Sequence, residues 1–123
     1  MLKNILLVGL GGAVGSMLRY LCTVGINKYF PSAFPWATFA INIIGCFLIG
    51  VFLALFSREQ SAQADVRLLL MTGLCGGYTT FSAFALENLH LFQAGQTNLA
   101  IIYMLTSVVL GVLAVWGGVV VVR

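Results

Sequence analysis

Long runs of apolar residues alternate with short polar stretches along this chain. Four runs approach or exceed the roughly 20 residues that a helix needs to cross the hydrocarbon core of a bilayer. They cover approximately residues 5–26, 35–56, 66–92 and 99–122. Because lipid offers no hydrogen-bond partner to an open backbone, each run is expected to be helical. The pattern predicts an all-α membrane protein, with four transmembrane helices in a single domain covering residues 1–123.

Composition supports a membrane protein. Hydrophobic residues make up 61% of the 123 positions and charged residues 7%, whereas about a quarter of the residues of soluble proteins are charged. The connections at residues 27–32, 57–65 and 93–98 carry turn-forming and polar side chains. No linker separates a soluble portion from the rest, and no cleavage site is expected after the first apolar run.

The charged side chains indicate how the spans are oriented. An even number of spans puts both termini on one side of the membrane, and positive residues favour the cytoplasmic side. The side of the termini collects Lys3, Arg58, Arg67 and Arg123, and the other side has Lys28 and, near the end of its span, Arg19. This bias favours termini inside the cell. It is modest, so insertion in both orientations stays open. The net charge of +3 is explained by membrane-flanking cations and not by a nucleic-acid patch.

Small residues recur at helical spacing in the first and fourth spans. Gly11 and Gly15 form a G-x-x-x-G pattern, and Gly111 and Gly118 lie on one line of the fourth span. This pattern predicts close helix packing. The cysteines lie inside apolar runs and are interpreted as small buried hydrophobes and not as a disulfide or metal framework; they are Cys22, Cys46 and Cys75.

The third apolar run contains a segment that is unsuited to the interior of a helix. Gly76 and Gly77 are followed, after Tyr78, by two β-branched threonines, so we expect the third helix to be broken at Gly76–Thr79. A break at membrane depth is tolerated only where the backbone is covered by protein or lines a cavity. It frees carbonyl groups to hold a cation and N–H groups to face an anion. The break is therefore predicted to form a site.

Hydroxyl and aromatic side chains follow the break. Thr80 and Ser82 add hydroxyls, and Phe81 and Phe84 present two rings to one side of the helix. The edge of a phenylalanine ring is positive, so rings turned edge-on stabilise an anion without a full charge that would trap it. Paired aromatics in a span also pack against one another, and that alternative remains open.

Further polar side chains lie in the second and fourth spans. Thr38, Asn42 and Gly45 share one helical face, which is explained either by an anion-facing donor or by an interhelical hydrogen bond. Tyr103 and Ser107, four residues apart, continue a row of hydroxyls. With Asn42 and the residues after the break they predict a narrow path of neutral donors. Such a path suits a small, strongly hydrated anion that must shed water and leave again quickly.

Few ionisable side chains lie within the spans. Arg19 is interpreted as packing against loop carbonyls, as lining a vestibule that attracts anions, or as both. Glu87 and His90 form a possible proton relay, but a structural hydrogen bond for Glu87 and interfacial solvation for His90 are the favoured interpretations. One histidine and three acidic residues offer no triad, dyad or metal site, so the sequence argues against an enzyme.

Three motifs resemble those of the Fluc (CrcB) fluoride channel family. Residues 11–20, GGAVGSMLRY, are similar to its GGxxGxxxR[WY] pattern, and PWAT at 35–38 with Asn42 is similar to P-x-G-T-x-x-x-N. Residues 73–84, GLCGGYTTFSAF, resemble G-x-x-G-G-x-T-T-F-S-T-F, the most specific of the three. Ala37, Ala83 and Gly111 depart from the glycine, threonine and serine that are usual at these positions, so a hydroxyl is missing at two of them.

The resemblance implies an antiparallel, dual-topology homodimer in the inner or plasma membrane of a prokaryote. Two pores per homodimer are expected to let toxic cytoplasmic fluoride leave passively. Each pore would use Asn42, the rings of Phe81 and Phe84, and a polar track with Tyr103 and Ser107. A structural sodium ion, which is not transported, is expected at the centre of the dimer on backbone carbonyls of Gly76 and Thr79.

Two other function classes compete with this one. A small proton-coupled multidrug-type transporter also has four short spans, but its mechanism needs a carboxylate in the first span, where Arg19 is the one charged residue between Asn4 and Ile26. A non-transporting assembly subunit would explain the small residues, but it leaves Asn42 and the break without a purpose.

Overall fold

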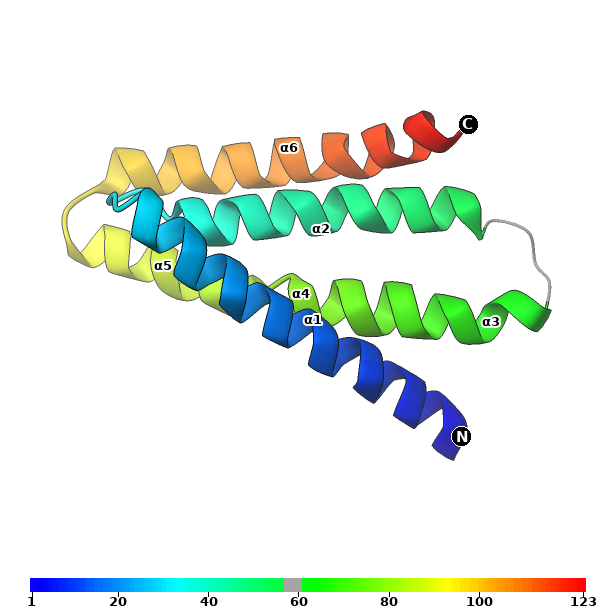
Figure 1. Ribbon diagram of the computed structural model, residues 1–123. Helices are drawn as coiled ribbons and strands as arrows, with labels where there is room; N and C mark the ends of the chain where they lie inside the picture. Colours follow the sequence, from blue (N-terminus) through cyan, green and yellow to red (C-terminus); the bar gives the residue numbers. More distant parts are fainter. Residues whose placement is uncertain (57–60) are drawn as a thin grey trace.

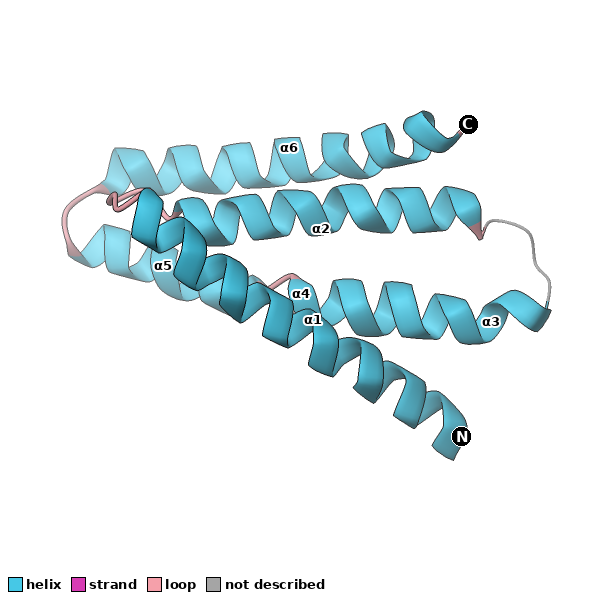
Figure 2. Cartoon of the chain, viewed as in Figure 1, coloured by secondary structure: helices cyan, strands magenta, loops and turns pink. Residues whose placement is uncertain are grey.

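The computed structural model describes residues 1–56 and 61–123 as a bundle of long helices with short connections (Figures 1 and 2). Four helical stretches are long and apolar enough to cross a membrane, which confirms the predicted multi-pass architecture. The elements are α1 (Leu2–Tyr29), α2 (Trp36–Leu55), α3 (Ser61–Arg67), the π-helical segment η1 (Leu68–Cys75), α4 (Gly76–Tyr78), α5 (Phe81–Gln93) and α6 (Thr97–Val122).

Two predicted connections are shorter than the sequence pattern indicated. The α1 helix continues through Tyr29, so the first half of the predicted 27–32 loop is helical. Lys28 lies in its last turn, where a cation interacts favourably with the helix dipole. The second connection also ends early, because α3 begins at Ser61. Arg58 and the rest of 57–60 lie outside the described residues.

Helix packing depends on glycines at the predicted positions. A Cβ at Gly11 or Gly15 of α1 would collide with the backbone of the third span, at Leu69 and Leu74 respectively. The same holds between α2 and α6, where Gly118 approaches the Phe47 carbonyl. The prediction that these small residues let helices approach closely is therefore confirmed. The α1 helix crosses the third span diagonally, and its N-terminal end projects away from α2 and α6 (Figure 1).

The third span is broken, but two residues later than the double glycine. Gly76 and Gly77 remain helical within α4, and the chain is extended at Thr79 (φ −81°, ψ 157°) and Thr80 (φ −148°, ψ 117°). The threonines, whose branched side chains favour extended backbone, therefore form the break. Gly77 has a different role, because a Cβ there would collide with the backbone of Gly12 in α1.

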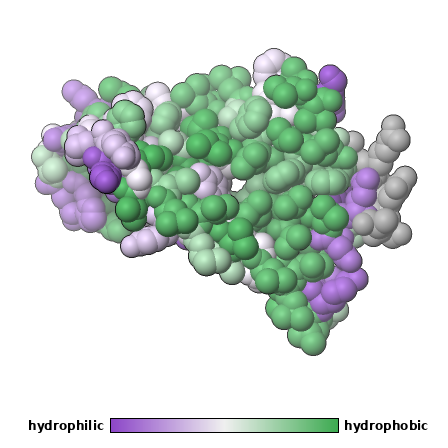
Figure 3. All heavy atoms as spheres, in the orientation of Figure 1, coloured by the Kyte–Doolittle hydropathy of each residue, from purple (hydrophilic) through white to green (hydrophobic). Residues whose placement is uncertain are grey.

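The interior of the bundle is small. Tyr103 and Ala100 are fully buried, and Leu91 packs with them. Many large apolar side chains of α1 and α6 face outward, as a lipid-facing surface requires. Figure 3 shows apolar residues over most of the visible face and hydrophilic residues gathered toward its two ends. At one end Lys3 Nζ lies 3.1 Å from Asp65 Oδ2.

Candidate pore site

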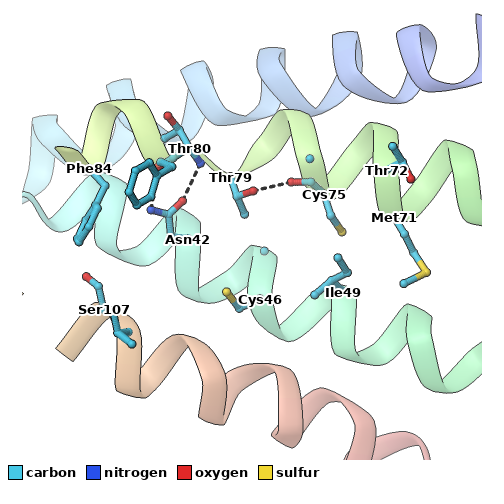
Figure 4. Close-up of a pocket in the computed structure, with 14 residues that line it drawn as sticks. Asn42, Cys46, Ile49, Met71, Thr72, Cys75, Thr79, Thr80, Phe84 and Ser107 are labelled. Carbon is cyan, nitrogen blue, oxygen red and sulfur yellow. Dashed lines mark hydrogen bonds between the residues drawn. The ribbon is translucent and has the colours of Figure 1, made fainter. Parts of the chain in front are cut away.

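A groove opens between α2, the third span and α6 at the level of the helix break (Figure 4). Its cavity has a volume of about 430 Å³, and every side chain that lines it is neutral. The groove brings together these predicted site residues: Asn42, Gly76, Thr79, Thr80, Phe81, Phe84 and Ser107.

The side-chain amide of Asn42 holds the extended backbone of the break. Asn42 Nδ2 donates to the Thr80 carbonyl at 3.2 Å, and the Thr80 N–H donates to Asn42 Oδ1 at 2.9 Å. The amide thus replaces the helical partners that Thr80 has lost. An NH₂ group has a second N–H, so Asn42 keeps one donor beyond this pairing. The two alternatives for Asn42, interhelical bonding and a donor at the groove, are therefore compatible.

Thr80 begins the second half of the broken span. Its Oγ1 accepts from the Ala83 N–H at 3.2 Å, which caps the N-terminus of α5. The same oxygen lies 3.3 Å from Ser82 Oγ, so the two hydroxyls form a pair at the start of α5. Thr80 is 9% exposed while Ser82 is exposed. The pair therefore links the break to the surface of the chain.

The two predicted rings differ in their surroundings. Phe81 and Phe84 have ring centroids 5.8 Å apart with an interplanar angle of 44°. Phe84 also meets the ring of Tyr103 at 5.0 Å and 63°, an edge-on contact that fixes its tilt. Phe81 is 79% exposed and projects from the chain. One ring is thus held by the protein interior and the other is available to a neighbouring molecule.

Glu87 of α5 connects three helices, because its carboxyl group bonds to both α2 and α6. Thr38 Oγ1 of α2 donates to Glu87 Oε2 at 2.8 Å, and Tyr103 Oη of α6 donates to Glu87 Oε1 at 3.1 Å. The structural hydrogen bond expected for Glu87 is confirmed, and the carboxyl group accepts two such bonds, one at each oxygen. The expectation that Thr38 and Asn42 face one neighbour is confirmed as well, because both bond to the third span.

The two hydroxyls of α6 that were predicted for the site, those of Tyr103 and Ser107, lie in different surroundings. Tyr103 bonds to Glu87 and lies among buried side chains, away from the groove lining. Ser107 lines the groove, and its Oγ is buried with no hydrogen-bond partner among the described residues. A buried hydroxyl without a partner is costly, so this atom is suited to bond a molecule inside the groove.

Arg19 lines a second cavity on the α1 side of the break. This cavity has a volume of about 350 Å³, and its lining includes Arg19, Thr38, Thr80 and Glu87. Thr80 lines both cavities, so the Arg19 cavity and the groove both border the break. The carbonyl of Arg19 accepts from Thr23 Oγ1 at 2.8 Å. The predicted vestibule residue is thus next to the pore candidates.

Gly76 and Thr79 both border the groove. The ψ of 157° at Thr79 turns its carbonyl away from the helical hydrogen-bond direction, which leaves that oxygen suited to another ligand. The Thr79 side chain bonds backward instead, with Oγ1 donating to the Cys75 carbonyl at 2.9 Å. Over the described residues no group of three His, Cys, Asp or Glu side chains could hold a metal ion.

Two residues of the site were missed by sequence reasoning. Asn88 is 5% exposed, and its Nδ2 donates to the Phe84 carbonyl at 2.9 Å. Its spacing of four residues from Phe84, in an apolar run, was a usable signal. Phe34 contacts the Tyr103 ring from the α1–α2 connection, at 5.3 Å. Nothing in the spacing of a loop residue indicates which buried ring it meets.

The chain matches known proteins along nearly its whole length. The family model described as "CrcB-like protein, Camphor Resistance (CrcB)" matches residues 6–119. The "Fluoride-specific ion channel FluC" of Flavobacterium psychrophilum is 47% identical over 99% of this chain and 98% of its own length. The protein of the same name from Phocaeicola vulgatus is 50% identical over 96% of this chain and 97% of its own. The chain therefore belongs to the CrcB family of membrane proteins, in which both of these bacterial relatives are named as ion channels.

Proposed function

We propose that this protein is a fluoride-selective channel that lets cytoplasmic fluoride leave the cell passively. One observation carries the proposal: the groove at the break is lined by neutral side chains, and among them Ser107 Oγ is a buried hydroxyl without a partner among the described residues. The relatives named as fluoride-specific channels, which match along nearly the whole chain, support the same ion. Fluoride enters cells from an acidic medium as neutral HF and is trapped as the anion at the higher pH inside, so a passive exit route is sufficient.

The chemistry of the groove suits a small anion. Asn42 has a second N–H beyond its bond to Thr80, and Ser107 has a hydroxyl without a partner in the described part of the chain. The Phe84 ring lies beside both in Figure 4. Neutral donors and ring edges replace part of the water that fluoride loses, and they bind it weakly enough to let it go. Arg19 places a positive charge in the neighbouring cavity, which Glu87 also lines, and leaves the groove itself without a charged side chain.

The functional unit of this proposal is an antiparallel, dual-topology homodimer with two pores. The groove is open along one side, and the Phe81 ring at its edge is 79% exposed. A second copy packed on this side would cover Phe81 and enclose the groove. The modest charge bias of the loops is compatible with insertion in both orientations. The proposed polar track is completed by Thr80 and Ser82. Tyr103 supports the track from outside the groove lining, because its ring contacts Phe84 and its hydroxyl bonds to Glu87.

A structural sodium ion at the centre of the dimer belongs to the same proposal. The backbone is compatible with such an ion, because the Thr79 carbonyl leaves the helical direction and the Thr80 N–H, the helical partner of the Gly76 carbonyl, donates to Asn42 Oδ1 instead. Carbonyl oxygens of an unwound segment are suitable ligands for sodium. When bound, the ion would neutralise the partial negative charges of these carbonyls and hold the two broken spans together.

A liposome efflux assay tests the proposal. Purified protein is reconstituted into vesicles loaded with potassium fluoride. A potassium ionophore lets potassium leave with the anion, so that charge stays balanced, and a fluoride electrode records the release. We expect passive fluoride release and much slower chloride release from matched vesicles. Release no faster than from protein-free vesicles, or equal release of both anions, would remove the channel assignment. Uphill flux driven by a proton gradient would point to a coupled transporter instead.

A further inference from the structure

Phe34 lies in the connection between α1 and α2, outside the helical spans, yet its ring reaches the interior of the bundle. It meets the Tyr103 ring at 5.3 Å and 70°, and the Phe39 ring at 5.5 Å and 72°. Both contacts are edge-on. The Trp36 ring lies 4.5 Å away on the side of the second helix. Phe34 is therefore held within an aromatic cluster and is not a free loop side chain.

The backbone on either side of this ring is also held. The Phe34 N–H donates to Ser32 Oγ at 3.2 Å, and the Trp36 N–H donates to the Phe34 carbonyl at 2.9 Å. Pro35 follows, and its ring restricts the backbone of the residue before it. The position of the Phe34 ring is thus determined by a short, restrained turn.

Tyr103 connects this turn to the groove. Its side chain is fully buried, it meets the Phe84 ring edge-on at 5.0 Å, and its hydroxyl bonds to Glu87 at 3.1 Å. Phe34 and Phe84 are thus two edge-on neighbours of a single ring. A change that frees the Tyr103 ring on the Phe34 side changes the surface against which Phe84 packs.

We propose that Phe34 is a positioning residue for the pore, which acts through Tyr103 to hold the tilt of the Phe84 ring. This inference rests on the proposed fluoride channel for its functional consequence. The tilt matters because the positive edge and the negative face of the ring act on an anion with opposite sign. A loop at the membrane surface therefore contributes to selectivity inside the groove.

The test compares Phe34→Leu with two matched variants in the liposome assay. Phe34→Leu is expected to lower fluoride release about three- to tenfold, the rate factor that corresponds to loss of one aromatic pair contact. It is also expected to lower the ratio of fluoride to chloride release. Phe34→Tyr keeps the ring and should restore both values. Phe30→Leu changes a ring of the same connection that is 63% exposed and should leave both unchanged.

Selectivity separates positioning from a loss of folded protein, because inactive protein lowers both fluxes alike once the release from protein-free vesicles is subtracted. An unchanged ratio in Phe34→Leu, or an equal change in Phe30→Leu, would overturn the inference. A ring label at position 84 gives a readout that does not depend on transport. With 4-fluorophenylalanine there, Phe34→Leu should shift or broaden the fluorine resonance while Phe30→Leu does not. An unshifted resonance would overturn the inference, whatever the transport assay shows. A lack of fluoride release from wild-type vesicles would count against the proposed function and not against the positioning role of Phe34.

Discussion

Asn42 and Thr80 pair through two hydrogen bonds, 38 residues apart in the chain, in which a side-chain amide takes the place of a peptide group. This pairing satisfies both backbone groups of a residue that the broken helix leaves at membrane depth. The amide therefore holds the geometry from which α5 and its two rings begin.

Replacing Asn42 separates its structural role from its role toward the anion. Asn42→Leu leaves the N–H and carbonyl of Thr80 without these partners, and each unsatisfied buried group costs about 1–3 kcal/mol. We expect a lower midpoint in thermal unfolding of the purified protein and loss of fluoride release. Asn42→Asp keeps the acceptor for the Thr80 N–H, so it should unfold at a higher temperature than Asn42→Leu. If ionised, its carboxylate would also repel an anion from the groove. Equal fluoride release by Asn42→Asp and wild type would contradict the assignment of Asn42 to the pore.

Gly45 is required by the side chain of Thr79. A Cβ at Gly45 would collide with Thr79 Cγ2, so Gly45→Ala is expected to displace the extended segment and to lower both stability and fluoride release. The matched control is Gly117→Ala, because a Cβ there meets nothing within 4 Å and alanine favours a helix by roughly 0.5–1 kcal/mol.

The second change that tests this contact is Thr79→Ser, which removes Cγ2 and keeps the hydroxyl that bonds to Cys75. Unfolding of the double variant Gly45→Ala with Thr79→Ser should show recovery of most of the stability that Gly45→Ala loses. Purely additive losses in this double-mutant cycle would show that the two sites are not coupled through the contact.

The rings of Phe81 and Phe84 are predicted to matter more for transport than for assembly. Phe81→Ile and Phe84→Ile keep an apolar side chain but remove the positive ring edge, so fluoride release should fall by about tenfold or more. The yield of dimer in size-exclusion chromatography should change much less. Parallel loss of dimer and of fluoride release in both variants would favour a packing role for the two rings.

Gly111 offers a position at which a hydroxyl can be added. A Cβ there lies 3.5 Å from Cys46 Sγ, an ordinary contact, so Gly111→Ser should fold normally. It extends the row of donors beyond Ser107 by one helical turn, and we expect faster fluoride release in the electrode assay. Gly111→Ala controls for the added Cβ and should leave the rate unchanged. Ser107→Ala should slow release, because it removes the buried hydroxyl that has no partner within residues 1–56 and 61–123.

Much of the fold could be predicted from the sequence because a bilayer imposes simple rules. Apolar length determined the four spans, and paired glycines indicated where helices approach. The boundaries near Tyr29 and Ser61 were less accurate, since helices continue into polar flanks that lie at the membrane surface. The position of the break was also offset, because both glycines are helical and Gly77 lies where α1 packs against the third span.

The sequence by itself determined the four-span bundle, the interrupted third span and many of the residues from which the candidate site is built. Only the tertiary structure decided which partners these residues take: Asn42 with Thr80, Glu87 with Thr38 and Tyr103, and Tyr103 with Phe34. The physical reason is that apolar length and local backbone preference are properties of neighbouring residues in the chain. A hydrogen bond or ring contact between spans depends instead on how the helices rotate and shift against one another, and close packing of the whole bundle sets that arrangement.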